Sequence, residues 1–283
     1  MGNPQVRLVD NPDHVTPAAF NIGVRHARSG LIAIVSAHSR VESGFFEGAL
    51  ARLAAADVAV VGGPVRTEPG GPGLLAWLLA QIVSHPFGVG NSRFRTSEEA
   101  GEVDAIPFGV FRRQVFDAVG LFDPSLVRNQ DTDFFGRVAR AGLRVYMDPS
   151  VRSVYRARAT LGGLLRQGFG NAYWNVLVWI RNPAAFRWRH AIPGIFGASL
   201  GLGMLLAPLS SAIQALLLLE LGAYALAAGG ASVQIAWRRG RPAGLLLPPL
   251  FFLYHVTYGC GSLAGLSWLI RQRGPRLPPP PGR

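Results

Sequence analysis

The first part of the chain alternates short apolar runs with a helical pattern. Residues 5–9 predict a short strand, and Asp10-Asn11-Pro12 is a turn signal directly after it. Residues 17–28 carry apolar positions at helical spacing and end before Gly30, which predicts a helix. Residues 31–35 are continuously apolar, as in a buried parallel strand. This strand–helix–strand order predicts a parallel sheet with a right-handed crossover.

The middle of the chain continues this alternation. Residues 45–56 and 74–83 repeat apolar positions at helical spacing and predict two more helices. Residues 58–61 predict a second buried strand, and residues 106–108 predict a third. Residues 88–102 are rich in glycine and polar side chains, so we expect a mobile lid or a loop that faces a bound ligand. The pattern indicates the α/β class.

The pattern changes after residue 158. Residues 161–180 mix aromatic, apolar and polar side chains, which predicts an amphipathic helix at a membrane interface. Residues 191–209 and 212–230 are each long and apolar enough to span a bilayer. The second of these contains Glu220, which we expect to pack between helices or to touch a lipid-linked molecule. Residues 243–270 form a third apolar stretch, interrupted by prolines and glycines.

These patterns divide the chain into four parts. We expect an α/β domain at 1–158, interfacial helices at 159–190, a membrane domain with two to three hydrophobic segments at 191–270, and a Pro/Arg tail at 271–283. One arginine cluster precedes the first apolar stretch, a second follows the second stretch and a third follows the third stretch. The positive-inside rule favours the cytoplasm for all three, which are Arg187/Arg189, Arg238/Arg239/Arg241 and Arg271/Arg273/Arg276. With two spans, the arginine clusters before the first span and after the second both lie in the cytoplasm. A third full span would place the arginine cluster after it outside the cytoplasm. Either the third segment is re-entrant or the rule is broken.

Composition narrows the classes of partner. The formal net charge is +12, and the 28 basic residues are all arginines. This excess suits an anionic partner: a nucleic acid, a nucleotide diphosphate or an anionic lipid leaflet. The membrane segments argue against a nucleic acid. The single cysteine, Cys260, excludes an intrachain disulfide and a cysteine-based zinc site. Residues 1–10 contain no apolar segment of the kind found in signal peptides.

The most informative stretch lies between residues 108 and 158. After a Gly/Pro turn, Asp131 and Asp133 stand at the start of a helical pattern that continues through Arg137. One interpretation is structural, because carboxylates at a helix start are favoured by the exposed N–H groups and the helix dipole. The other is that one of these carboxylates is a general base. The local pattern leaves both open.

This stretch resembles the acceptor-side motif of family 2 glycosyltransferases. The matching pieces are Gly120-x-Phe122-Asp123, Gln130-Asp131-x-Asp133, Arg137 and Ala141-Gly142. More of the chain resembles one branch, the membrane glycosyltransferases of the succinoglycan (exopolysaccharide) type. The pieces that carry this likeness are the run from Ser84 to Gly90, Phe94-Arg95, Val103-Asp104, the run from Phe108 to Arg113, the run from Leu126 to Asp131, Asp148-Pro149-Ser150, and Tyr155-x-x-Arg158.

The resemblance implies a nucleotide-diphospho-sugar transferase fold of the GT-A type, a Rossmann-like mixed sheet followed by transmembrane helices. It also implies a divalent cation, Mg²⁺ or Mn²⁺, held by a D-x-D or D-x-H motif. Here Ser36-Ala37-His38 stands at that place, so Ser36 and His38 are the candidate metal ligands and the first carboxylate is missing. The family's first strand–helix–strand unit, which holds the nucleotide base, has no counterpart before residue 5. We therefore expect an N-terminally shortened fold, or a native chain that begins upstream.

The resemblance assigns the remaining roles residue by residue. Asp131 would be the catalytic base, and Asp133 and Arg137 would orient it or bind the acceptor. Gln130 precedes the base, as in this branch. Asp104 would lie near the donor sugar, and Arg95 could neutralise a diphosphate. Gln167 and Trp174 lie where membrane relatives carry an acceptor-binding Q-x-x-R-W strip, which the chain matches loosely.

The sequence favours a membrane-bound inverting glycosyltransferase. It would transfer a sugar from a nucleotide-diphosphate donor to a lipid-linked or polysaccharide acceptor, in the inner membrane with its catalytic domain in the cytoplasm. The alternative is a non-catalytic membrane subunit that binds a glycan or a partner enzyme, which the serine at position 36 favours. A third possibility, a small transporter, is disfavoured because the first part of the chain has the pattern of a soluble α/β domain.

Overall fold

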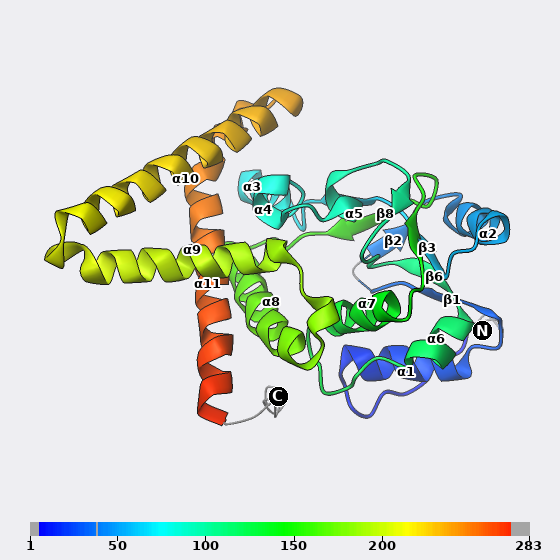
Figure 1. The fold of residues 1–283 in the computed structure, drawn as a ribbon. Coiled ribbons are helices and arrows are strands. Elements are labelled where there is room, and N and C mark those ends of the chain that lie inside the picture. The colour runs from blue at the N-terminus through cyan, green and yellow to red at the C-terminus, as the bar shows by residue number, and fades with distance from the viewer. Residues whose placement is uncertain (1–5, 38, 273–283) are drawn as a thin grey trace.

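The computed structural model describes residues 6–37 and 39–272, and over these residues the strands form two mixed sheets (Figure 1). The larger sheet has the strand order β1-β6-β3-β7-β5, and the smaller has the order β2-β8-β4. In the larger sheet β3 and β7 are parallel and the other pairs are antiparallel. The strands are β1 Leu31–Ile34, β2 Ser39–Val41, β3 Val60–Gly62, β4 Val65–Glu68, β5 Gly101–Glu102, β6 Gly109–Arg112, β7 Val145–Met147 and β8 Ser153–Arg156.

Helices cover both faces of the larger sheet. Helices α1 (Thr16–His26), α6 (Arg113–Val119) and α7 (Gln130–Arg140) pack on one face, and α2 (Phe45–Ala55) packs on the other. The neighbouring side chains Val60 and Val61 show why, because successive residues of a strand point to opposite faces. Val60 packs in the cluster with α6 and α7, and Val61 packs with α2.

Three shorter helices link the α/β domain to the C-terminal part. They are α3 (Leu74–Ile82), α4 (Pro86–Val89) and α5 (Arg93–Thr96). The buried side chains of α3 share one apolar cluster with β4, β8 and the long helices that follow. The smaller sheet and these long helices therefore have a continuous core, which fixes the membrane helices against the α/β domain.

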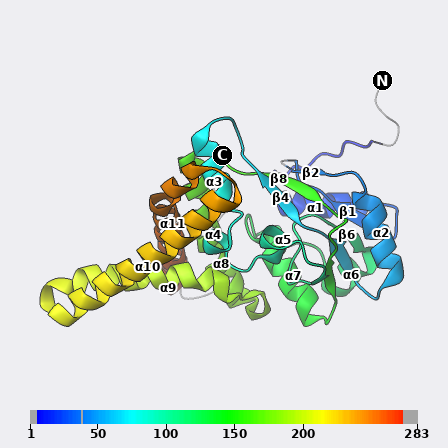
Figure 2. The same cartoon turned by 90° about the horizontal axis from the view of Figure 1, so that it is seen from above.

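The C-terminal part consists of four long helices joined by short 3-10 turns. They are α8 (Leu161–Arg181), α9 (Trp188–Leu206), α10 (Ser211–Arg238) and α11 (Leu247–Gln272). Within the described residues, three segments are long and apolar enough to cross a membrane: Trp188–Leu209, Ser211–Arg238 and Pro242–Arg271. Helices α9 and α10 form a hairpin that projects away from the α/β domain in both views (Figures 1 and 2).

The third apolar segment is not interrupted as the sequence suggested. Helix α11 is continuous through Pro248-Pro249 and through Gly259-Cys260-Gly261. The prolines lie in its first turn, where their missing N–H groups have no helical partner to lose. The glycines serve close packing instead: an added Cβ at Gly261 would lie 2.3 Å from the carbonyl oxygen of Phe169 in α8. A glycine that another backbone approaches this closely marks helix packing rather than a helix break.

The predicted helices at 17–28, 45–56 and 74–83 are confirmed with small shifts at their ends, but two predicted strands are wrong. Residues 6–9 of the expected first strand have no regular structure, and residue 5 lies outside the described residues. Residues 106–108 are not a strand either, although Ile106 and Phe108 are buried. The expected loop at 88–102 contains α5, the last residues of α4 and the short strand β5.

The predicted parallel pairing of residues 31–35 is also wrong. Strand β1 lies at an edge of the sheet and pairs antiparallel with β6. Its burial alternates, with Ile32 and Ile34 buried and Ala33 exposed. The prediction was wrong because the side chains on both faces of this strand are apolar, which is typical of a central parallel strand. The edge position depends instead on pairing with β6, which lies far away in the sequence.

Candidate functional site

Asp131 lies in the first turn of α7, at a helix start held by an unusual residue. Asn129, the residue before the helix, adopts a left-handed conformation with φ of 56°. Its side-chain amide donates to the backbone oxygen of Asn171 at 2.7 Å and to Oδ1 of Asn175 at 2.8 Å, both in α8. These two bonds fix the start of α7 against α8 and so fix the position of Asp131.

The Asp131 carboxylate faces a cavity of about 200 Å³ between the α/β domain and the membrane helices. It accepts a hydrogen bond from the backbone N–H of Thr132 at 2.9 Å, and it has no ion-pair partner among the described residues. Solvent reaches Asp131, but the cavity walls replace much of the surrounding water. This desolvation raises the pKa of Asp131, and the Thr132 N–H and the charge of Arg95 only partly oppose the rise.

Membrane helix α11 forms one wall of this cavity. Tyr254 and Tyr258 of α11 line it together with Asn171 and Asn175 of α8. The Asn175 side chain donates to the Tyr258 hydroxyl at 2.8 Å, so Asn175 joins Asn129 to α11. The cavity is therefore built jointly by the α/β domain and by helices that the sequence assigns to the membrane.

Arg95 in α5 lines the Asp131 cavity and also a second cavity. Its guanidinium lies 4.7 Å from the centre of the Tyr155 ring and donates to Thr67 Oγ1 at 3.5 Å. It has no carboxylate within ion-pair distance among the described residues. Burial lowers the pKa of Arg95, while Tyr155 and Asp131 act in the opposite direction. A desolvated guanidinium without a carboxylate partner is suited to bind an anion.

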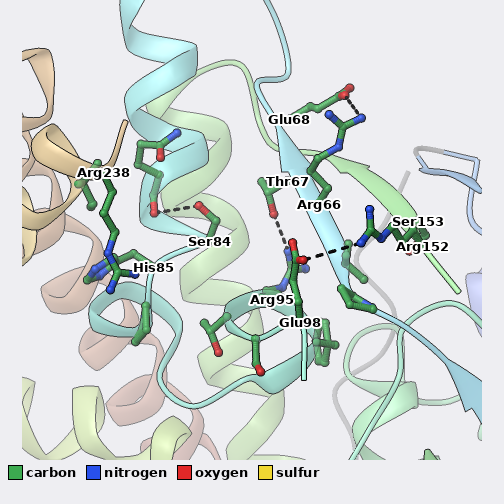
Figure 3. A pocket seen from close by; sticks show the side chains of 18 of the residues that line it. Arg66, Thr67, Glu68, Ser84, His85, Arg95, Glu98, Arg152, Ser153 and Arg238 are labelled. Atoms are coloured by element: carbon green, nitrogen blue, oxygen red, sulfur yellow. Dashed lines mark hydrogen bonds and ion pairs between the residues drawn. The ribbon is translucent and has the colours of Figure 1, made fainter. Parts of the chain in front are cut away.

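The second cavity measures about 950 Å³ and lies between β4, the loop after α3, α5 and the end of α10 (Figure 3). Arg66 and Arg152 pair with glutamates on its wall, at 3.1 Å for Arg66 to Glu68 and 3.9 Å for Arg152 to Glu98. Arg238 and Arg239 have no carboxylate partner among the described residues. Its charged lining side chains are Arg66, Arg95, Arg152, Arg238, Arg239, Glu42, Glu68 and Glu98. The excess of arginine makes this cavity electropositive.

Asp104 binds two arginines, one directly before α9 and one in its first turn. Its Oδ2 accepts from Arg187 Nε at 3.0 Å and from Arg189 Nη1 at 2.6 Å. Burial acts to raise the pKa of Asp104, but the charges and hydrogen bonds of Arg189 and Arg187 outweigh it and lower the pKa. Arg189 also lines the Asp131 cavity, so Asp104 holds a guanidinium at the rim of that cavity.

Asp133 and Arg137 face away from the Asp131 cavity. Asp133 is buried, accepts from Arg137 Nε at 2.9 Å and from Asn182 Nδ2 at 3.0 Å, and lines a separate surface pocket. Arg137 also donates to the backbone oxygens of Val119 and Leu121. These contacts join α6, α7 and α8, and they leave neither side chain directed at the cavity.

The other predicted binding residues are not brought together. Gln167 donates to the Tyr155 hydroxyl at 3.2 Å and accepts from Arg158 at 3.3 Å, beside Arg95 but outside the lining of the Asp131 cavity. Trp174 is buried in a cluster with Leu126 and Leu177. Gln130 stands at the first position of α7 and does not line the cavity.

The described residues do not form a cation site. Ser36 follows strand β1, where its backbone oxygen accepts from the N–H of Ser39, and His38 lies outside the described residues. No group of three or more His, Cys, Asp or Glu side chains comes together over residues 6–37 and 39–272 in a way that could hold a metal ion. Because His38 lies outside these residues, the described part of the chain holds only one of the two candidate ligands, Ser36, for the Mg²⁺ or Mn²⁺ that the resemblance implies.

The sequence analysis did not identify Asn171, Arg189 and Tyr258 as residues that line the Asp131 cavity, and it did not identify Arg128 as a neighbour of Asn171. Arg128 reaches Oδ1 of Asn171 at 3.4 Å, and burial together with the nearby charge of Arg158 lowers the pKa of Arg128. Arg128 comes from the loop before α7. It places a basic group beside Asn171, whereas the strip of α8 that loosely matches the Q-x-x-R-W of membrane relatives contains no arginine. The signal that could have indicated Arg128 was its place directly before the acidic motif.

The comparisons with known proteins agree with the motifs. No protein-family profile matches the sequence. The chain is 27% identical over 263 residues to the succinoglycan biosynthesis protein ExoA of Rhizobium meliloti, covering 92% of this chain and 77% of that protein. It is 22% identical over 277 residues to the dolichyl N-acetyl-alpha-D-glucosaminyl phosphate 3-beta-D-2,3-diacetamido-2,3-dideoxy-beta-D-glucuronosyltransferase of Methanococcus voltae, covering 92% of this chain and 78% of that protein.

Among solved structures, the chain is similar to the mannosyltransferase PcManGT from Pyrobaculum calidifontis in complex with GDP-Man and Mn²⁺. The TM-score is 0.48 at 16% identity, over 87% of this chain and 66% of that one. The two curated relatives confirm the resemblance to family 2 glycosyltransferases that the motifs carry. They indicate a glycosyltransferase that acts in exopolysaccharide or other glycan synthesis, and the apolar helices indicate association with a membrane.

Proposed function

We propose that this chain is an inverting glycosyltransferase of the inner membrane. It would transfer a sugar from a nucleotide-diphosphate donor to a lipid-linked or polysaccharide acceptor on the cytoplasmic side. The observation that supports the proposal most is the setting of Asp131. Its carboxylate is desolvated, it has no ion-pair partner among the described residues, and it faces a cavity whose other wall is membrane helix α11.

In the proposed reaction the Asp131 carboxylate takes the proton of an acceptor hydroxyl. The hydroxyl oxygen attacks the anomeric carbon of the donor sugar, and the bond from that carbon to the diphosphate oxygen breaks. Attack from the opposite side inverts the anomeric centre. A raised pKa suits this role, because a stronger base removes a hydroxyl proton more readily.

Charge on the leaving diphosphate would be neutralised by arginines at the two cavities. Arg95 lines both cavities, and Asp104 holds Arg189 at the rim of the smaller one. Guanidinium groups in a partly water-excluded site bind phosphate oxygens strongly. The larger cavity, with Arg238 and Arg239 on its wall, has the size and charge for the anionic part of a substrate. A divalent cation, which the resemblance implies, would add positive charge beside the leaving diphosphate, and Ser36 and His38 are its candidate ligands.

One observation favours a second candidate, a membrane subunit that binds a glycan without catalysis. Ser36 stands where the resemblance implies a carboxylate ligand, and a hydroxyl is a weaker ligand for a hard cation. Such a protein would keep the cavities and the membrane helices but would not turn over a donor.

Transfer of label from nucleotide sugars to a lipid extract would test the proposal. Membranes containing the wild-type chain, Asp131→Asn and the control Asp117→Asn would be compared, since Asp117 is exposed on α6 and lines neither cavity. We expect transfer to fall by about a hundredfold or more in Asp131→Asn and to be unchanged in Asp117→Asn. Undiminished transfer in Asp131→Asn would refute the assignment of the base. A wild-type chain that binds donor or acceptor glycan but transfers nothing would favour the second candidate.

A further inference from the structure

Helices α8 and α11 lie side by side along much of their length. An added Cβ at Gly168 would lie 2.8 Å from the Tyr254 ring, and one at Gly265 would lie 2.8 Å from the Tyr173 carbonyl oxygen. Further along, Trp268 and Leu269 pack against the cluster that contains Trp174. Residue numbers rise together on both helices, so the two run in the same direction.

Helix α8 is also part of the α/β domain. Its buried side chains pack on Leu126, and Asn182 at its end donates to the backbone and side chain of Asp133. It is not among the segments apolar enough to cross a membrane, because it carries Arg166, Gln167, Asn171 and Arg181. Helix α8 therefore belongs at the surface of a membrane, with the domain that it carries in water.

This arrangement constrains α11. If α11 crossed the bilayer, α8 would lie at the depth of the hydrocarbon beside it. Tyr254 and Tyr258 near the middle of α11 would place the cavity of Asp131 and Arg95 at that depth as well. Charged side chains in the hydrocarbon cost several kcal/mol each. A third full span is incompatible with the way in which the α/β domain is attached.

The hairpin of α9 and α10 has no such constraint. It crosses α11 close to Gly197 and Gly259, where an added Cβ at Gly259 would lie 3.0 Å from the Gly197 Cα, and then projects away from the domain (Figures 1 and 2). Only 6% of the apolar window of α9 and 17% of that of α10 are buried in the protein, against 39% for α11. Over the described residues, most of the apolar surface of the hairpin helices is therefore exposed, as expected where a bilayer would supply lipid.

We propose that α9 and α10 are the membrane spans and that α11 lies in the plane of the membrane surface. One face of α11 packs on α8, and its opposite face enters the boundary of the hydrocarbon. That face is exposed and mainly apolar, and it carries Leu253, Cys260, Leu263, Leu266 and Ile270. An in-plane amphipathic helix buries one apolar face roughly 5–10 Å into the headgroup and acyl boundary.

The placement of charges and aromatic rings agrees with this topology. Arg187 and Arg189 precede the body of α9, Arg238 and Arg239 follow α10, and Arg271 ends α11. A two-span hairpin with an in-plane α11 puts all of them on one side, as the positive-inside rule favours. Trp188 and Trp237 are 70% and 83% exposed at the two ends of the hairpin that lie on that side, where indole rings prefer the membrane interface.

A depth profile along α11 tests the proposal without reference to any enzymatic activity. Leu253, Cys260 and Ser267 are exposed and share one face, since they are spaced by seven residues. Native Cys260 would carry one nitroxide label, and Leu253→Cys and Ser267→Cys would carry it in a Cys260→Ala background. The chain would be reconstituted in vesicles of phosphatidylethanolamine and phosphatidylglycerol, and label depth would be measured by collision with oxygen and with a nickel complex.

We expect the three labels to lie within about 5 Å of one depth. A transmembrane or re-entrant α11 would instead give a steady change of about 21 Å between positions 253 and 267, from a rise of 1.5 Å per residue. A gradient of that size would overturn the proposal.

Sidedness gives a second, independent readout. Ser210→Cys, at the tip of the hairpin, and Arg239→Cys would be labelled in the Cys260→Ala background of the full chain with a membrane-impermeant maleimide. A fluorescent protein fused after the last residue would report the side of the C-terminus. We expect position 210 to react only from the outer side, and position 239 and the C-terminus to be cytoplasmic. A C-terminus on the same side as position 210 would overturn the proposal.

Discussion

Asp104 and Arg189 form an ion pair of 2.6 Å that joins the α/β domain to the first turn of membrane helix α9. The same carboxylate binds Arg187 at 3.0 Å, so one aspartate neutralises two arginines. Asp104→Asn would leave both partly buried guanidinium groups without their counter-charge. We expect it to lower the free energy of unfolding by roughly 1–3 kcal/mol, measured by thermal unfolding in detergent. Asp117→Asn is the matched control, and equal stability of the two variants would contradict the assigned role.

The same pair predicts how stability depends on pH. The pKa of Asp104 is lowered in the folded chain, so its contribution is fully present above the pKa of an unfolded aspartate, about 3.9. The contribution is lost as the pH falls through the lowered folded value. We expect the stability difference between wild type and Asp104→Asn to be constant near neutral pH and to shrink below about pH 4. A difference that vanishes already at pH 6 would point to another group.

For Asp131 we expect the opposite dependence of stability on pH. Desolvation raises the pKa of Asp131, so the folded chain binds this proton more tightly than the unfolded chain does. Stability from this group is therefore lost as the pH rises through the raised folded pKa. At neutral pH, Asp131→Asn should abolish transfer and leave the melting temperature unchanged or slightly higher, because it removes an unpaired charge that solvent still reaches. A melting temperature that falls in this variant would argue against the desolvated, unpaired setting.

The pH profile of transfer reports the same group. Only the ionised carboxylate can accept a proton, so kcat/KM should fall on the acid side with a midpoint above the ordinary aspartate pKa of about 3.9. The measurement is the rate of transfer at low acceptor concentration across a pH series. An acid limb at or below the ordinary value would show that Asp131 is not the base.

Arg95 is expected to bind an anionic part of a substrate. Arg95→Gln removes the charge, and Arg95→Lys keeps the charge but loses the planar group that stacks on Tyr155. We expect the KM for the nucleotide sugar to rise by about tenfold or more in Arg95→Gln and by less in Arg95→Lys. Arg93→Gln is the control, since Arg93 donates to the backbone oxygen of Glu102 and lines neither cavity. An unchanged KM in Arg95→Gln would remove Arg95 from the site.

Gly259 predicts a packing defect at the crossing of α9 and α11. An added Cβ would lie 2.6 Å from the Pro193 carbonyl oxygen and 3.0 Å from the Gly197 Cα, and neither backbone can move without separating the helices. Gly259→Ala should cost about 1–3 kcal/mol in stability. In Gly222→Ala, where nothing lies within 4 Å, the change should be neutral, so thermal unfolding of the two variants in detergent separates packing from glycine content. Equal stability would mean that the helices do not cross this closely.

A substitution at position 36 tests whether donor binding depends on a divalent cation. Ser36→Asp would supply the carboxylate that the resemblance implies, and a carboxylate is a stronger ligand for Mn²⁺ than a hydroxyl. We expect donor binding by the wild type to change little on addition of Mn²⁺ or of a chelator. In Ser36→Asp we expect Mn²⁺ to tighten donor binding by roughly tenfold, as measured by calorimetry. A wild-type chain that loses all donor binding on chelation would show that residues other than Ser36 supply a competent site.

The sequence by itself determined the class and the main chemistry. Periodicity identified helices at 17–28, 45–56 and 74–83, because a buried apolar stripe at helical spacing is a local property of the chain. The ordered motifs indicated a family 2 glycosyltransferase, and the two curated relatives confirm that resemblance. Apolar length alone found the three membrane-length segments.

Only the tertiary structure decided how these parts face one another. Asp131 and Asp133 are two residues apart and chemically identical. They point in different directions from α7, so one faces the cavity and the other binds Arg137 and Asn182. Asp104 binds Arg187 and Arg189, which are more than eighty residues away in the sequence, and no local pattern reveals a contact of this kind. Likewise the hydropathy of α11 allows a span, and the proposal that α11 lies in the membrane plane rests on its packing along α8. Hydropathy records the affinity of side chains for lipid and not the direction of a helix.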